Sequence, residues 1–178
     1  VDDEPNYSPE TLDTAWPTIV RVLAPRLLGK SIEGPGEVHA LLDKDVRGHN
    51  MAKAALEMAI LDAQLRATDQ SFASFLGVER TTIPSGVSVG IHDSTDELLA
   101  AVQGYVDDGY VRIKLKIEPG SDIDQVAAVR DLIGPDTPFQ VDANTAYRRT
   151  DGAHLRRLDE YDLLLIEQPL PEDDIIGH

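Results

Sequence analysis

Three short apolar runs, each ending in a charged residue, recur at nearly constant spacing in the second half of the chain. They occupy residues 111–116, 139–142 and 163–167. Stretches with helical spacing of apolar residues, 122–133 and 150–160, separate them. This order predicts alternating strands and helices around a parallel sheet. A charge at every strand end is typical of a (β/α) barrel, in which functional groups come from the C-terminal ends of different strands.

Side chains of a strand alternate between two faces, so each run divides into an apolar and a polar face. Ile113, Leu115 and Val141 lie on the apolar faces, which must receive the helices of a barrel. Unpaired ammonium groups are costly in an interior, so we expect the inward lysines to lie at a solvated mouth beside carboxylates. The inward faces of the first two runs carry Arg112, Lys114, Lys116, Gln140, Asp142 and Asn144. In the third run, Glu167 shares a face with Leu163 and Leu165.

An earlier run, residues 85–91, predicts a preceding strand in which Val87 and Val89 alternate with Ser88 and Gly90. Small inward side chains there leave room for a ligand. With this run, the chain contains four recognisable strands from residue 84 to residue 178.

Residues 1–83 have a helical pattern instead. Ser8 and Pro9 predict the start of a first helix, which continues to Leu23 and is interrupted by Pro25 and Gly29. Further helices are predicted at 36–42 and 50–67, and the alanine-rich part of the last one predicts close packing against its neighbours.

Composition restricts the function. The chain has 32 acidic and 16 basic residues and a net charge of −16, which argues against binding to nucleic acid or to anionic membranes. No apolar stretch approaches the roughly 20 residues of a membrane span. The chain has no cysteine, so it has neither a disulfide framework nor a thiolate metal site. These features fit a cytoplasmic protein.

The charged strand ends stand in three motifs: Lys-Leu-Lys at 114–116, Asp-Ala-Asn at 142–144 and Glu-Gln-Pro at 167–169. In this order they resemble the enolase superfamily, in the subgroup typified by muconate-lactonizing enzymes. Longer segments resemble more narrowly the o-succinylbenzoate synthases and the N-acylamino acid racemases. These segments are residues 48–59, 86–91, 111–117 and 140–147. The likeness extends from about Asn6 onward.

The resemblance implies an α/β architecture: the helices of an α+β capping domain, residues 1–83, followed by a partial (β/α) barrel, residues 84–178. A complete barrel takes about 250 residues. We therefore expect the chain to be truncated at both ends. On this interpretation, the strands and specificity loop of the capping domain precede Val1, and a third metal carboxylate and a second lysine lie beyond His178.

The chemistry implied by the resemblance is abstraction of a proton alpha to a carboxylate. Lys116 is the expected base, with its pKa lowered by a metal and by Lys114. Asp142 and Glu167 are expected to bind Mg²⁺, for which Mn²⁺ could substitute. The expected contacts to a small-molecule carboxylate substrate come from Ser88 and Asn144.

The favoured activity is that of an o-succinylbenzoate synthase, a lyase of menaquinone biosynthesis that removes the proton and then eliminates water. An N-acylamino acid racemase, a dipeptide epimerase or a cycloisomerase would use the same base. A non-catalytic α/β binding module is the alternative from another class. A homo-oligomer is compatible with each of these.

Several of these residues also have simpler interpretations. The lysine pair could lie on a surface strand, and the two carboxylates could cap helices. Asn144 could fix its own loop, and Ser88 could serve packing. His49 precedes a predicted helix and is interpreted as a cap or packing residue. The acidic residues 172–174 follow Pro171 and are interpreted as a solvated loop with a helix start.

Overall fold

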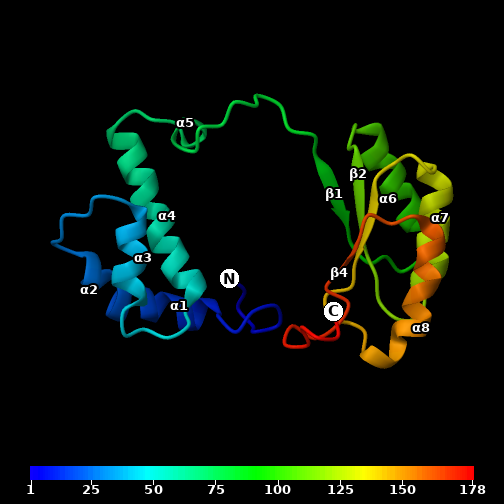
Figure 1. Cartoon of the computed structure of the whole chain (residues 1–178), viewed down its shortest axis with the longest axis horizontal. Helices are drawn as coiled ribbons and strands as arrows, with labels where there is room; N and C mark the ends of the chain where they lie inside the picture. Colours follow the sequence, from blue (N-terminus) through cyan, green and yellow to red (C-terminus); the bar gives the residue numbers. More distant parts are fainter. The chain divides into compact units, whose positions relative to one another are not determined.

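A computed structural model describes all 178 residues, which form two compact units, Val1–Thr81 and Thr82–His178. The first unit contains helices, and the second contains a sheet with helices against it (Figure 1). The helical elements of the first unit are α1 Leu12–Thr18, η1 Ile19–Leu23, α2 Ala24–Leu27, α3 Pro35–Asp43, α4 Asn50–Ala67 and α5 Phe72–Phe75.

The first helix differs from its prediction at both ends. It begins after Thr11, whose backbone N–H donates to Thr14 Oγ1 at 2.9 Å, so Ser8 is not its cap. It also continues past Pro25 to Leu27, because the wider π-helical turn η1 intervenes. Proline has no N–H to donate and its ring crowds the preceding turn, and a π-type turn relaxes both constraints.

The core of the first unit is small and comes from α1 to α4. Helices α3 and α4 contain the predicted segments, but the alanine-rich face of α4 is largely open. Ala52 is buried, whereas Ala55 and Ala59 are exposed, so α4 packs against its neighbours along one face only. Trp16 is also 63% exposed. The buried apolar cluster consists of Ala15, Leu23, Leu27, Val38, Leu42 and Ala52.

The second unit is built on one sheet of four parallel strands in the order β1-β2-β3-β4. The strands are β1 Gly86–Val89, β2 Arg112–Lys116, β3 Phe139–Asp142 and β4 Ile166–Glu167. Sequential parallel strands joined by helical connections are the repeating unit of the predicted barrel. The α/β class and the parallel sheet are therefore confirmed.

The apolar face of this sheet is covered by two helices, α6 Thr95–Asp107 and α7 Asp122–Ile133, as Figure 1 shows. Ile113, Leu115 and Val141 are completely buried in the cluster that these helices complete with Val102 and Val126. The period-two assignment of the outer face is confirmed. The polar face of the same strands is consequently the face that faces away from α6 and α7.

Two connections depart from the sequence pattern. Helix α6 lies outside the predicted helices, although Ser94 is a clear cap whose Oγ accepts from Glu97 N at 3.2 Å. The single helix expected over 150–160 is divided into η2 Arg149–Asp151, α8 Gly152–Leu155 and η3 Arg156–Tyr161. Strand β4 has only two residues, and Leu165 before it is 47% exposed.

Burial beneath the helices predicts where the second unit is sensitive to substitution. Leu115→Ala should lower the free energy of unfolding by about 2–5 kcal/mol, because it leaves a cavity under α6 and α7. Leu132→Ala on the more exposed face of α7 is the matched control and should cost about 0.5 kcal/mol or less. Urea denaturation followed by circular dichroism measures both. Equal losses in the two variants would contradict the assigned outer face.

Candidate active site

The strand register aligns the charged ends of the strands. Lys116 of β2 pairs with Asp142 of β3, which in turn pairs with Glu167 of β4. Two residues before Lys116, Lys114 pairs with Ser88 of β1 on one side and with Gln140 of β3 on the other. Because parallel strands all end at the same edge of the sheet, these side chains meet at its C-terminal edge.

Lys114 lies between the two carboxylates. Its Nζ is 3.1 Å from Asp142 Oδ2, and it donates to Glu167 Oε2 at 3.1 Å. The Asp142 residue is 2% exposed, so its charge is compensated within the protein. The Nζ atom of Lys116 is a second cation near Asp142, at 3.7 Å from its Oδ2. Strand β2 therefore provides both cations of the cluster, and β3 and β4 each provide one anion.

The pKa of Lys114 reflects two opposing effects in this cluster, burial and the neighbouring carboxylates. Burial alone would lower the pKa of Lys114, but hydrogen bonds and charges from Asp142 and Glu167 outweigh burial and raise that pKa above its ordinary value. Lys114 is consequently a fixed positive charge at neutral pH. The side chain of Lys116 is 35% exposed and has contact with only one carboxylate.

Asn144 follows β3 and touches two members of the cluster. Its side-chain Oδ1 accepts a hydrogen bond from Lys116 Nζ, and its backbone N–H donates to Asp142 Oδ1 at 3.1 Å. Ser88 is exposed on the same face of the sheet. The structure thus brings Lys114, Lys116, Asp142, Asn144 and Glu167 into direct contact, with Ser88 beside them in the register.

The backbone that follows β3 and β4 is conformationally unusual. Asn144, Thr145 and Gln168 have φ angles of 39°, 69° and 46°, in the left-handed region that residues with a side chain seldom adopt. Such conformations often cluster at functional sites. The segment after β3 and the segment after β4 are joined by a hydrogen bond from Thr145 N to Gln168 O at 2.8 Å.

The donors present are suited in kind to a hard divalent cation. The carboxylates of Asp142 and Glu167 converge on one positive charge, which is the ammonium group of Lys114. Oxygen donors of this type are preferred by Mg²⁺, which usually keeps water or substrate oxygens as further ligands. No group of three or more His, Cys, Asp or Glu side chains gathers around a common point. The two carboxylates therefore fit part of a metal site.

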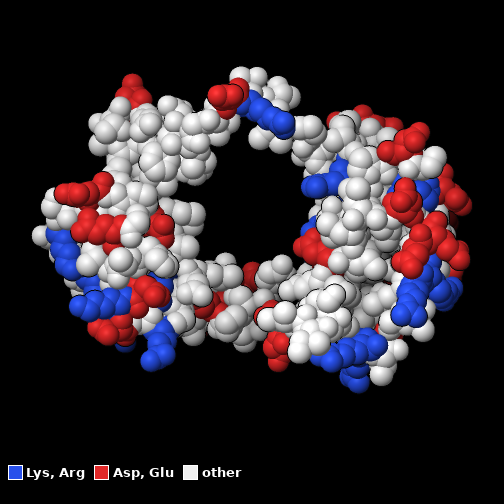
Figure 2. Space-filling view, viewed as in Figure 1, with Lys and Arg blue, Asp and Glu red and all other residues white.

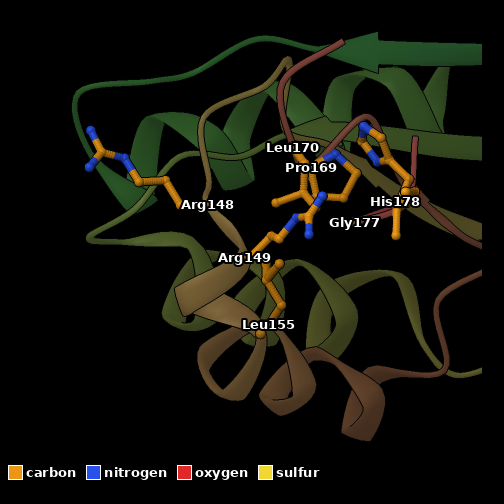
Figure 3. Close-up of a pocket in the computed structure, with 9 residues that line it drawn as sticks. Arg148, Arg149, Leu155, Pro169, Leu170, Gly177 and His178 are labelled. Atoms are coloured by element: carbon orange, nitrogen blue, oxygen red, sulfur yellow. The ribbon is translucent and has the colours of Figure 1, made fainter. Parts of the chain in front are cut away.

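A separate pocket of about 360 Å³ lies beside the segment after β4, away from the cluster (Figure 3). Arg149 points toward Pro169 and Leu170 there, whereas Arg148 points away. Arg149 forms an ion pair with Asp174, which also accepts a hydrogen bond from Gly177 N at 2.9 Å. The pocket shares no lining residue with the lysine–carboxylate cluster. The guanidinium group of Arg149 in this pocket is already paired with Asp174.

Sequence reasoning missed a buried polar group close to the site. Tyr147, Asp122 and His154 are hydrogen bonded to one another through the Asp122 carboxylate. The one sequence feature that could have pointed to this group is the position of Tyr147, three residues after Asn144. Its partners are 25 and 7 residues away along the chain, and no local periodicity connects them. His49, interpreted as a cap or packing residue, precedes α4 in a left-handed conformation and forms no side-chain capping bond.

Charges are interspersed on the visible surface. Figure 2 shows acidic and basic side chains mixed over the helices of each unit, without an extended basic area on that face. None of the helices is both long and apolar enough to pass through a membrane.

Two family comparisons together cover most of the chain. Residues 7–77 match the family described as the N-terminal domain of mandelate racemase and muconate lactonizing enzyme. Residues 97–178 match the family described as enolase C-terminal domain-like. The chain therefore belongs to the enolase superfamily, in the mandelate racemase and muconate lactonizing enzyme group. The family resemblance noted from the three motifs is therefore confirmed, and the parallel sheet is the partial barrel that it implied.

Named relatives cover this chain almost completely. An N-succinylamino acid racemase from Amycolatopsis is 54% identical over 98% of this chain and 47% of its own length. An o-succinylbenzoate synthase from Enterococcus faecalis is 44% identical over 99% of this chain and 47% of its own length. An enolase superfamily member from Listeria innocua, known by its crystal structure, has a TM-score of 0.93 and 40% identity, covering 100% of this chain and 47% of its own. The chain spans about half the length of the curated relatives it matches.

The position of Lys114 between two carboxylates predicts its titration. Because its pKa is raised in the folded chain, the resulting stabilisation is complete below the unfolded-state pKa of about 10.4 and is lost as pH rises through the folded-state value. Glu167→Gln should lower the pKa of Lys114, since one of the two anions is removed. A matched control, Glu172→Gln, changes an exposed acid and should leave it unchanged. Side-chain NMR titration of Lys114 measures both, and an equal response to the two substitutions would contradict the ion-pair geometry.

Proposed function

We propose that the whole protein carrying this chain catalyses abstraction of a proton alpha to a carboxylate, as an o-succinylbenzoate synthase-like lyase. One observation carries the proposal: two lysines and two carboxylates from three adjacent parallel strands meet at the C-terminal edge of the sheet. That edge is where (β/α) barrels hold their catalytic groups. Membership of the enolase superfamily supports the same chemistry.

Lys116 is the proposed base. It is the less enclosed of the two lysines, and it contacts one carboxylate, whereas Lys114 is held between two. Lys114 remains protonated and is suited to hold a substrate oxygen. Asn144 orients the Lys116 ammonium group through its side-chain oxygen. In the synthase reaction, Lys116 Nζ takes the alpha proton as the C–H bond breaks. The C–O bond to the substrate hydroxyl then breaks as the carbon–carbon double bond forms, and the Lys116 ammonium group returns the proton to the departing oxygen, so that water leaves.

Asp142 and Glu167 are the proposed holders of Mg²⁺, with Mn²⁺ as a substitute. A bound divalent cation would stabilise the negative charge that develops on the substrate carboxylate as the alpha proton leaves. Further ligands would come from water, substrate or other parts of the whole protein. Ser88, exposed beside Lys114 in the register, is the proposed contact for the substrate carboxylate.

The relatives favour a second candidate of the same chemistry. The racemase from Amycolatopsis shares 54% of the aligned residues, whereas the synthase from Enterococcus faecalis shares 44%. Racemisation of an N-acylamino acid would use Lys116 on one face of the alpha carbon and a second base on the other. Assaying the whole protein with both substrate types separates the two: dehydration to the aromatic acid identifies the synthase, and inversion of an N-succinylamino acid identifies the racemase. Neither reaction, and no alpha-proton exchange, would support a binding module.

Other parts of the proposal rest on the synthase resemblance. They are the capping-domain role of residues 1–83, the catalytic-domain role of residues 84–178, a place in menaquinone biosynthesis and a cytoplasmic location.

Removing the proposed base should abolish turnover. Lys116→Ala in the whole protein should lower kcat by about 10²–10⁴-fold, since it removes the proposed acceptor of the alpha proton. Lys116→Arg should fail as well, because a guanidinium group stays protonated. Lys114→Ala should have a smaller effect. The measurements are product formation and exchange of the substrate alpha proton in deuterated water, and an exposed-lysine variant, Lys30→Arg, is the control. Near-parental turnover by Lys116→Arg would remove Lys116 from the mechanism.

Metal dependence tests the two carboxylates separately from the base. Excess chelator should abolish activity of the whole protein, and added Mg²⁺ or Mn²⁺ should restore it. Glu167→Gln should raise the Mg²⁺ concentration needed for half-maximal activity, whereas Asp173→Asn changes an exposed acid outside the cluster and should not. Full activity in excess chelator would contradict the proposed role of Asp142 and Glu167.

A further inference from the structure

A buried polar cluster lies close to the candidate active site and has no part in the chemistry proposed above. Tyr147 and Asp122 are each 1% exposed. The Tyr147 hydroxyl donates to Asp122 Oδ2 at 2.6 Å, and His154 Nε2 lies 2.6 Å from the same oxygen. Because a carboxylate only accepts, His154 contributes its Nε2–H. The rings of Tyr147 and His154 are also stacked, with centroids 6.3 Å apart.

The three residues come from two connections of the sheet, the one between β2 and β3 and the one between β3 and β4. Asp122 is the first residue of α7, which follows β2; Tyr147 belongs to the segment after β3; and His154 belongs to α8. The cluster therefore joins the connection that follows Lys116 to the segment that contains Asn144. The Asp122 carboxylate stays ionised and so keeps accepting hydrogen bonds from both partners. Burial alone would raise the pKa of Asp122, but hydrogen bonds from Tyr147 and His154 keep it below its ordinary value.

The segment that Tyr147 ends is the strained segment of the site. Asn144 and Thr145 both have positive φ angles, and such conformations persist only where surrounding contacts hold them. Tyr147 provides two such contacts. Its side chain bonds to Asp122, and its backbone N–H donates to Pro169 O at 3.0 Å, beside the strained Gln168.

We propose that Tyr147, Asp122 and His154 are positioning residues that hold Asn144 in the strained conformation from which its side chain orients Lys116. Asn144 is the link because it contacts Lys116 through its side chain and Asp142 through its backbone. This inference rests on the proposed function for the role of Lys116. The position of Asn144 itself does not depend on that function.

The first test is Tyr147→Phe in the whole protein, which removes one hydroxyl group and keeps the ring. Loss of alignment at the base should lower kcat by about 10–100-fold while KM changes by less than about threefold. Tyr105→Phe in α6 removes a tyrosine hydroxyl that is not part of this cluster and should leave kcat and KM unchanged.

A control for stability separates positioning from folding. Thr137→Val removes the bond from Thr137 Oγ1 to Ile133 O at 2.6 Å, on the connection that precedes β3. This variant should lose stability without losing kcat. If Thr137→Val lowered kcat as much as Tyr147→Phe at equal loss of stability, the cluster would have only a structural role and the proposal would be wrong.

Conservative rescue gives a second test. Asp122→Asn keeps an oxygen that accepts from Tyr147, so its kcat should stay within about threefold of the parental value. Asp122→Leu keeps the volume but no acceptor and should reproduce the loss seen in Tyr147→Phe. Equal activity of the Asn and Leu variants, with both folded by circular dichroism, would overturn the role of the hydrogen bond.

NMR of the whole protein makes the outcome independent of the activity. The side-chain amide signals of Asn144 should shift in Tyr147→Phe and stay in place in Tyr105→Phe. If the parental whole protein has neither enzymatic activity, the proposed function fails, and the Asn144 signals still decide the positioning role. Unchanged Asn144 signals in Tyr147→Phe would overturn the inference even in an active enzyme.

Discussion

The buried carboxylate of Asp142 is the group on which the arrangement of the sheet edge depends. A charge with 2% exposure is stable only if other charges and donors compensate for the lost water. Lys114 and Lys116 supply positive charge from the neighbouring strand, and Asn144 supplies a backbone N–H. Removing any one of these changes the electrostatics of the others. The site therefore behaves as one coupled group of charges, and single substitutions there need a readout that separates binding from proton transfer.

One face of these strands packs in the hydrophobic core, and the other face carries the charged residues of the site. Ile113, Leu115 and Val141 supply the apolar surface that α6 and α7 cover, and the alternate positions supply the lysines and Asp142. A shift of register by one residue would expose the apolar set and bury the lysines. The hydrophobic effect that stabilises the outer face consequently also fixes which charges meet at the C-terminal edge.

This division explains which features could be predicted from the sequence. The period of two locates Lys114, Lys116 and Asp142 on one face without knowledge of the fold, and parallel pairing then brings Glu167 alongside. Local patterns were less informative where several weak preferences compete. Pro25 did not end the first helix because a π-helical turn accommodated it, and the helical pattern of 150–160 became three short elements.

The contacts that hold Asn144 could not be predicted for a different reason. Tyr147, Asp122 and His154 lie on separate elements, so their meeting depends on how the connections fold over the sheet. Tyrosine and histidine after a strand are ordinary loop residues by composition, and an acid in the first turn of a helix is favoured by the helix dipole alone. Only the three-dimensional structure shows that these residues share one carboxylate oxygen.

The proposed chemistry also bears on the choice between synthase and racemase. Both reactions begin with removal of an alpha proton, and a single base on one face of the substrate is sufficient for that step. The reactions diverge afterwards, according to whether a leaving group departs or a proton returns on the opposite face. The cluster of this chain lies on one sheet edge and provides one candidate base, Lys116. If the proposed function is right, the lysine–carboxylate cluster therefore determines that the alpha proton is removed, and the group that meets the opposite face of the substrate determines the product.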